Sequence, residues 1–239
     1  MKTSIKKLFN YVGLHICKLN TTNSSGLQTA KALKAHDINV LFDIGANTGQ
    51  FATELRFHGY QGKIISFEPL PQAHQILTKQ AEQDANWIVH PRCAIGAEMG
   101  KIDINVSQNL VSSSILPMLD THKNAAPESR YTHTEQADLM TLDSLLKDYV
   151  APSDKLFIKI DTQGYEWSVL DGAPQSLQQC KGVLLELSLV PLYQGQKLWT
   201  ETIERLNKIA LNLYGVQPGF TDPQTGRTLQ IDGLFFKNE

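Results

Sequence analysis

The chain has 239 residues, of which 41% are hydrophobic and 19% are charged. Its 22 Lys and Arg residues nearly balance 24 Asp and Glu residues, which gives a formal net charge of −2 at pH 7. These values indicate an ordinary folded protein and exclude disordered and fibrous chains. They also disfavour nucleic acid as the main partner, because a phosphate backbone is bound by a basic surface.

The first 25 residues differ from the rest of the chain, since they begin with several lysines and end in a polar run. We expect residues 1–25 to form a helical extension and residues 26–239 to form the main domain. No run approaches the roughly 18–20 apolar residues that span a bilayer, so we expect no transmembrane segment. The three cysteines are widely spaced and form no CxxC pair, which indicates a reducing compartment and predicts a cytoplasmic protein.

From residue 24 onward, helical stretches alternate with short apolar runs. Ser24 or Ser25 is a suitable cap for a helix that ends near His36. Five apolar runs have the length of strands that are buried on both faces, at 40–44, 63–67, 87–89, 156–160 and 183–187. Helical stretches lie at 50–57, 72–80, 167–170 with 174–179, and 198–211. This alternation predicts an α/β fold with a mostly parallel sheet.

Two parts of the chain depart from this alternation. The C-terminal runs 211–216 and 233–236 predict a closing hairpin of antiparallel edge strands, with a turn at Pro218 and Gly219. An insertion is predicted at about 97–154, with a strand at 101–106, a loop at 121–134 and a short helix after Thr141. Insertions between core strands commonly form one wall of a binding site.

The segment from Asp43 to Gly49 joins a predicted strand to a predicted helix. A turn of this kind presents backbone amides to a ligand at the carboxyl edge of the sheet. A dinucleotide loop reads GxGxxG, but Asn47 and Gln50 stand where its second and third glycines belong, which weakens an NAD interpretation. The residues favour a nucleoside cofactor without a pyrophosphate. Cationic S-adenosylmethionine fits, with Asp43 complementing its positive methionine end.

A second acidic residue, Glu68, directly follows the next apolar run. It lies 19 residues after Gly49. An acidic residue about 20 residues past the loop binds the ribose hydroxyls in nucleotide-binding βαβ units. Glu68 is therefore the predicted ribose ligand.

Seven motifs in a fixed order resemble the FkbM-type S-adenosylmethionine-dependent methyltransferases. They are Asp-Ile-Gly-Ala-Asn-Thr-Gly at 43–49, Phe-Glu-Pro at 67–69, Ala-Ile-Gly at 94–96, Ser-Ser at 113–114, Thr-Leu-Asp at 141–143, Ile-Lys-Ile-Asp-Thr-Gln-Gly-Tyr-Glu at 158–166 and Leu-Glu at 185–186. The resemblance covers residues 38–236. It implies a class I methyltransferase fold, with a seven-stranded, mostly parallel sheet and an antiparallel terminal hairpin. It also implies methyl transfer to a hydroxyl, so the expected partner is a small hydroxylated molecule or glycan, such as a sugar or polyketide.

Carried over position by position, the resemblance implies a set of cofactor-binding residues. They are Asp43, Gly45, Ala46, Asn47, Gly49, Glu68, Pro69, Cys93, Ala94, Ser113 and Ser114.

Four charged residues in or after the later strands are the catalytic candidates. An alcohol is a poor nucleophile at neutral pH, so a base must take its proton, and Asp161 is our candidate. Lys159 lies on the same strand face and either pairs with Asp161 or steadies developing charge. Glu166 either caps a helix or binds the acceptor. Glu186 interrupts an apolar run and is expected in the acceptor pocket, because a buried carboxylate is costly unless it is paired.

Several alternatives stay open. Asp161 and Glu186 together are able to hold a divalent cation, an option we do not favour. The seven histidines lack zinc-binding spacing, and we predict no metal site. The competing functions are an NAD-dependent oxidoreductase and a domain that binds the cofactor without catalysis. Several acceptors fit the sequence equally well, and both a monomer and a homo-oligomer are compatible with it.

Overall fold

The structure is a computed structural model that describes residues 9–14 and 16–238. Part of the predicted N-terminal extension, residues 1–8 and 15, lies outside the described residues. Residues 10–14 and 16–23 are exposed, and regular packing begins at Ser24. Within the described ranges, none of the helices combines the length and apolar character needed to cross a membrane.

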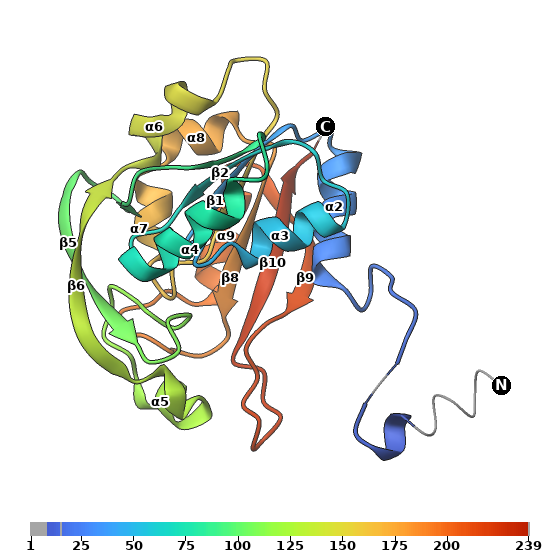
Figure 1. The fold of residues 1–239 in the computed structure, drawn as a ribbon, viewed down its shortest axis with the longest axis vertical. Coiled ribbons are helices and arrows are strands. Elements are labelled where there is room, and N and C mark those ends of the chain that lie inside the picture. Colours follow the sequence, from blue (N-terminus) through green and yellow to red (C-terminus); the bar gives the residue numbers. More distant parts are fainter. Residues whose placement is uncertain (1–8, 15, 239) are drawn as a thin grey trace.

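Seven strands form the central sheet in the order β3-β2-β1-β7-β8-β10-β9 (Figure 1). They are β1 (Val40–Ile44), β2 (Lys63–Phe67), β3 (Trp87–Val89), β7 (Leu156–Ile160), β8 (Gly182–Ser188), β9 (Leu211–Pro218) and β10 (Gln230–Lys237). Neighbouring strands from β3 to β8 are parallel, whereas β10 is antiparallel to both β8 and β9. The predicted seven-stranded, mostly parallel sheet with an antiparallel terminal hairpin is confirmed.

The terminal hairpin differs in detail from the prediction. Both hairpin strands were expected at the edge of the sheet. Instead, β10 lies inside the sheet between β8 and β9, and β9 alone of these two strands forms an edge. The connection runs over residues 219–229 instead of turning at Pro218 and Gly219. Leu234 and Phe236 are buried in the core on one face of the sheet, and Phe235 is buried in the core on the other.

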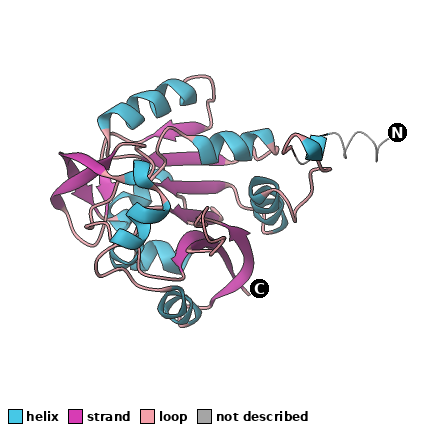
Figure 2. Ribbon diagram, turned by 90° about the horizontal axis from the view of Figure 1, so that it is seen from below, coloured by secondary structure: helices cyan, strands magenta, loops and turns pink. Residues whose placement is uncertain are grey.

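Helices cover both faces of the sheet (Figure 2). One face packs against α2 (Ser25–Ala35), α3 (Gln50–Phe57) and α4 (Pro71–Ala81). The other packs against α6 (Leu142–Tyr149), α7 (Glu166–Asp171), α8 (Pro174–Gln179) and α9 (Trp199–Asn207). Ser24 caps α2 as predicted, since its side chain accepts a hydrogen bond of 3.2 Å from the Leu27 N–H.

The predicted insertion builds most of a second sheet beside the first, in the order β4-β6-β5 (Figure 1). Its elements are β4 (Ala94–Ile95), β5 (Gly100–Ser107), α5 (Asp120–Ala125), the 3₁₀ turn Pro127–Ser129 and β6 (Tyr131–Met140). The prediction of a loop at 121–134 was wrong, because α5 and the start of β6 lie there. The first half of β6 carries polar side chains, so its sequence lacks an apolar alternation, and pairing with β5 orders it.

The strand order places a crevice between β1 and β7. The chain leaves β1 through α3 toward β2 on one side, and leaves β7 through α7 and α8 toward β8 on the other. Open α/β sheets bind ligands at the carboxyl ends of strands where the connections diverge in this way.

Candidate active site

The loop after β1 is held in shape by glycines and by backbone contacts with the loop after β7. Gly45 has φ of +69°, and a Cβ there would collide with the backbone carbonyl oxygen of Asp161. Gly49 has φ of +93° where α3 begins, and its Cβ would lie 2.8 Å from the Trp87 ring. Both positions therefore require glycine for backbone and packing reasons. Gly45 lines the cavities described below, whereas Gly49 supports the loop from behind.

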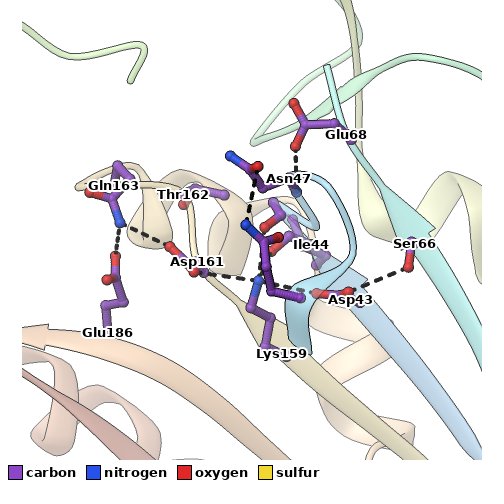
Figure 3. Close-up of polar contacts among 12 residues, drawn as sticks. Asp43, Ile44, Asn47, Ser66, Glu68, Lys159, Asp161, Thr162, Gln163 and Glu186 are labelled. Carbon is purple, nitrogen blue, oxygen red and sulfur yellow. Dashed lines mark hydrogen bonds and ion pairs between the residues drawn. The ribbon is translucent and has the colours of Figure 1, made fainter. Parts of the chain in front are cut away.

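A buried ion pair lies beneath this loop (Figure 3). Asp43 and Lys159 are direct neighbours in the β1–β7 register, and Lys159 Nζ lies 3.1 Å from Asp43 Oδ1. The same ammonium donates hydrogen bonds to the carbonyl oxygens of Ile44 (3.2 Å) and Gly45 (2.8 Å) and lies 3.5 Å from Asp161 Oδ2. Burial lowers the pKa of Lys159, but the Asp43 and Asp161 carboxylates outweigh burial and raise the pKa, so the lysine stays charged.

This geometry changes the role expected of Asp43. Its carboxylate is fully buried, faces Lys159 and accepts a hydrogen bond of 3.4 Å from Ser66 Oγ. It lines neither of the two cavities at this edge of the sheet. The contacts of Asp43 with Lys159 and Ser66 support the loop, and its contact with a ligand's methionine end stays a prediction.

The first cavity lies over the carboxyl ends of β1 and β2 and is closed by the second sheet. The predicted cofactor residues that line it are Gly45, Asn47, Glu68, Pro69, Cys93, Ala94, Ser113 and Ser114. Sequence reasoning missed its apolar walls, which include Leu70, Ile95, Ile104, Leu110, Val111 and Ile115. Several of these residues come from β5 and the loop after it, so part of the predicted insertion lines this cavity.

Glu68 is the charged side chain at the floor of this cavity. It is 4% exposed, and its two oxygens accept hydrogen bonds of 2.8 Å from the backbone N–H groups of Asn47 and Leu70. Burial raises the pKa of Glu68 to about 7, against the lowering effect of those two N–H groups. Each carboxylate oxygen has a second lone pair, so Glu68 is able to accept hydrogen bonds from a ligand as well.

The second cavity adjoins the first and shares Gly45, Asn47, Val111 and Asp161 with it. It extends over β7, β8 and β10 toward α2 and α3. Its lining includes three further predicted residues, Ala46, Lys159 and Glu186. It also includes polar residues that sequence reasoning missed, namely Ser25, Thr29, Gln50, Glu54, Gln217 and Asp232.

Gln163 joins two of the predicted catalytic carboxylates (Figure 3). Its Nε2 donates hydrogen bonds to Asp161 Oδ1 (3.0 Å) and Glu186 Oε2 (2.8 Å), and its Oε1 accepts one from the Tyr193 hydroxyl (2.8 Å). Burial, together with the charges of Asp161 and Glu166, raises the pKa of Glu186 well above its ordinary value. The structure therefore brings Asp161 and Glu186 together through an amide that the sequence analysis did not single out.

Glu166, another of the predicted catalytic residues, lies at the start of α7 and outside both cavities. It is 4% exposed, and its Oε1 accepts hydrogen bonds from the N–H groups of Thr162 (3.1 Å) and Gly164 (3.0 Å). Burial raises its pKa to about 7. Because Glu166 lines neither cavity, the structure favours the capping alternative over contact with an acceptor.

The contacts of Asp161 and Glu186 also bear on whether these two residues hold a divalent cation. Among residues 9–14 and 16–238, no group of three or more His, Cys, Asp and Glu side chains is placed to hold a metal ion. The Nε2 group of Gln163 donates hydrogen bonds to both Asp161 and Glu186, so an amide bridges these two carboxylates.

Comparisons with known proteins agree with this geometry. Residues 43–214 match the methyltransferase FkbM domain. The hexuronic acid methyltransferase AglP of Haloferax volcanii is 25% identical over 182 residues, which cover 73% of this chain and 69% of that protein. Methyltransferase sdnD of Sordaria araneosa is 26% identical over 156 residues, which cover 56% of this chain and 60% of that protein. A crystal structure described as a "putative methyltransferase" from Thermobifida fusca shares the fold, with a TM-score of 0.51 and 11% identity over 90% of this chain and 79% of that one.

Proposed function

The chain belongs to the FkbM methyltransferase family, and on this premise we propose that it transfers a methyl group from S-adenosylmethionine to a hydroxyl of a sugar, glycan or polyketide-like natural product. The observation that carries the proposal is the meeting of two unlike cavities at Gly45, Asn47 and Asp161. The first is walled by apolar side chains around the buried Glu68 carboxylate, and the second adds the acidic side chains of Glu186 and Asp232 to a largely apolar lining. A cofactor and an acceptor that exchange a methyl group need two adjoining pockets of this kind.

The residues of the first cavity fit the nucleoside part of the cofactor. Glu68 presents a buried carboxylate to the cavity, and ribose hydroxyls are suitable donors to it. The apolar side chains of Ile95, Ile104 and Leu110 offer a dry surface for an adenine ring. The methionine part would extend past Asn47 into the second cavity.

The cofactor supplies an electrophilic methyl group on a sulfonium. The protein must hold the acceptor oxygen in line with that group, and such positioning supplies roughly 7–11 kcal/mol in well-oriented reactions. Asp161 lines both cavities, so we assign it the role of accepting the hydroxyl proton. Lys159 and Gln163 hold its two oxygens from opposite sides, which makes them positioning residues. Glu186 then binds the acceptor.

The polar groups of the second cavity support a hydroxyl oxygen as the atom that receives the methyl group. Its carboxylates and amides suit a molecule with several hydroxyls, which donates and accepts hydrogen bonds. One relative is named a hexuronic acid methyltransferase, which supports a sugar as the general class of acceptor.

Calorimetric titration with S-adenosylhomocysteine and, separately, with NAD tests the cofactor. We expect micromolar binding of the former, a large loss of affinity in Glu68→Gln, and no loss in Glu98→Gln, an exposed glutamate away from both cavities. Circular dichroism should establish that both variants are folded. Preference for NAD would refute the proposal. Tight binding of S-adenosylhomocysteine without methyl transfer to any hydroxylated acceptor would support the non-catalytic alternative.

A further inference from the structure

The second cavity is lined by more acidic than basic side chains. Its acidic residues are Glu54, Asp161, Glu186 and Asp232, and Lys159 is the basic residue among the described residues that line it. Glu54 lies at the rim, with its side chain 49% exposed and its Oε1 accepting a hydrogen bond from a backbone N–H. The other three carboxylates lie deeper, around the carboxyl ends of β7 and β8.

The single lysine is already fully engaged by the protein. Its ammonium has three protons. These protons face two backbone carbonyl oxygens and the carboxylates of Asp43 and Asp161, and the side chain is 7% exposed. Lys159 therefore has no donor left for a negatively charged group on an acceptor.

Asp232 stands in register with Glu186. The two residues are direct cross-strand partners on β10 and β8, and Gln217 on β9 is in turn the partner of Asp232. Directly paired residues point to the same face of a sheet, so the three form one polar row. No hydrogen bond or ion pair to the Asp232 carboxylate occurs within the described part of the chain, although Asp232 lines the cavity. Burial and the charge of Asp161 raise the pKa of Asp232 to about 7, so above that pH its ionised oxygens are free to accept hydrogen bonds from a ligand.

The next row toward the end of β8 is also polar and incomplete. Ser188 and Gln230 are cross-strand partners, two residues along from Glu186 and Asp232 and hence on the same face. They are 2% and 3% exposed, and neither Ser188 Oγ nor Gln230 Nε2 has a hydrogen-bond partner among the described residues. Buried polar atoms are normally paired, so this row has unused hydrogen-bonding capacity next to the cavity, although neither residue lines it.

We infer that the row Glu186–Asp232 is the acceptor subsite, and that it selects an uncharged, polyhydroxylated ring over a ring that bears a carboxylate. The inference rests on the proposed function and narrows its substrate class to neutral sugars. Hydroxyl groups are hydrogen-bond donors and match the free carboxylate oxygens of the row. A uronate would bring a negative charge beside the ionised form of Asp232 and close to Asp161, with no available cation to offset its desolvation.

The test uses neutral and acidic sugars that differ at one carbon. Methyl transfer from radiolabelled S-adenosylmethionine is measured on paired p-nitrophenyl glycosides, namely glucoside with glucuronide and galactoside with galacturonide. We expect the neutral member of a pair to be favoured at least tenfold in kcat/KM. In Asp232→Asn this preference should narrow, because the repulsion of the uronide is reduced. Glu98→Gln, which removes an exposed charge distant from the cavity, should keep the wild-type preference.

Three results would count against the inference. A wild-type preference for the uronides would overturn it and leave the proposed function standing. An equal effect of Asp232→Asn on both members of a pair would show that Asp232 does not discriminate charge. Absence of transfer to every glycoside would overturn both the inference and the sugar acceptor of the proposed function, whereas the cofactor assignment would still be decided by S-adenosylhomocysteine binding.

Discussion

Replacing Lys159 by methionine tests whether the buried ion pair beneath the cofactor loop is structurally essential. The substitution keeps most of the side-chain length but leaves the Asp43 carboxylate, which is 0% exposed, without its cation. Removing one partner of a buried pair costs about 3–5 kcal/mol, because the remaining charge is desolvated and unpaired. We therefore expect Lys159→Met to lower the free energy of unfolding by about 3–5 kcal/mol.

Urea unfolding at pH 7, followed by circular dichroism, measures this loss. The matched control is Lys155→Met, because Lys155 pairs with Asp37 at 3.0 Å but both side chains are exposed, at 44% and 78%. Exposed pairs contribute about 0–1 kcal/mol, so the control should lose no more than that.

A double variant separates the pair from other effects of the lysine. If the Asp43 charge causes the loss, Asp43→Asn combined with Lys159→Met should cost less than the sum of the two single variants, by about 0.5–3 kcal/mol. Equal losses in Lys159→Met and Lys155→Met, or strict additivity with Asp43→Asn, would refute the assignment of Asp43 and Lys159 as a coupled pair.

Three further predictions concern the site itself. Gly45→Ala should abolish S-adenosylhomocysteine binding in calorimetry, because the new Cβ would collide with the Asp161 carbonyl. The control is Gly59→Ala, because Gly59 also has a positive φ, of +88°, but a Cβ there meets open space. This control should lose only about 1–2 kcal/mol of stability. Because burial raises the pKa of Glu68 to about 7 and ribose hydroxyls need its ionised form, affinity for S-adenosylhomocysteine should rise about tenfold from pH 6 to pH 8. The same titration in Glu68→Gln should be flat, and an affinity that falls with pH would contradict the ribose assignment. Gln163→Leu should lower kcat roughly 100-fold through misplacement of Asp161, with cofactor affinity retained, and an unchanged kcat would remove Gln163 from the positioning residues.

Buried parallel strands could be predicted from the sequence almost to the residue. β1, β2, β3 and β7 begin and end where their apolar runs do, because a strand covered on both faces is mostly apolar. The buried polar residues inside these strands, Asp43, Ser66 and Lys159, contact one another. β6 could not be predicted in the same way. Its residues 131–136 are polar and largely exposed, and the backbone ladder with β5, together with burial of Ala137 and Leu139, holds them in a strand.

The sequence predicted which residues lie at the ends of the strands, but not which residues of neighbouring strands lie side by side. Asp43 and Glu68 both come at the ends of strands, yet Glu68 lines a cavity and Asp43 does not. Asp43 is the fourth residue of the five-residue β1, directly opposite Lys159, so both side chains lie on the face covered by α2 and α3. Asp232 escaped prediction for the same reason, because only the pairing of β10 with β8 places it beside Glu186. Such cross-strand neighbours are far apart in the chain, and no local pattern specifies them.

The segment from Asp161 to Gly164 couples the two cavities mechanically. The Asp161 N–H donates a hydrogen bond of 3.1 Å to the Ile44 carbonyl, and its own carbonyl fills the space where a side chain at Gly45 would lie. Its carboxylate faces both cavities, while Gln163 reaches across to Glu186. A displacement of this segment would therefore move both the proposed cofactor loop at Ile44 and Gly45 and the side chain of Glu186. In an in-line transfer the rate depends on the distance between the methyl group and the acceptor oxygen. Because one turn contacts both the loop after β1 and Glu186, it helps to fix that distance.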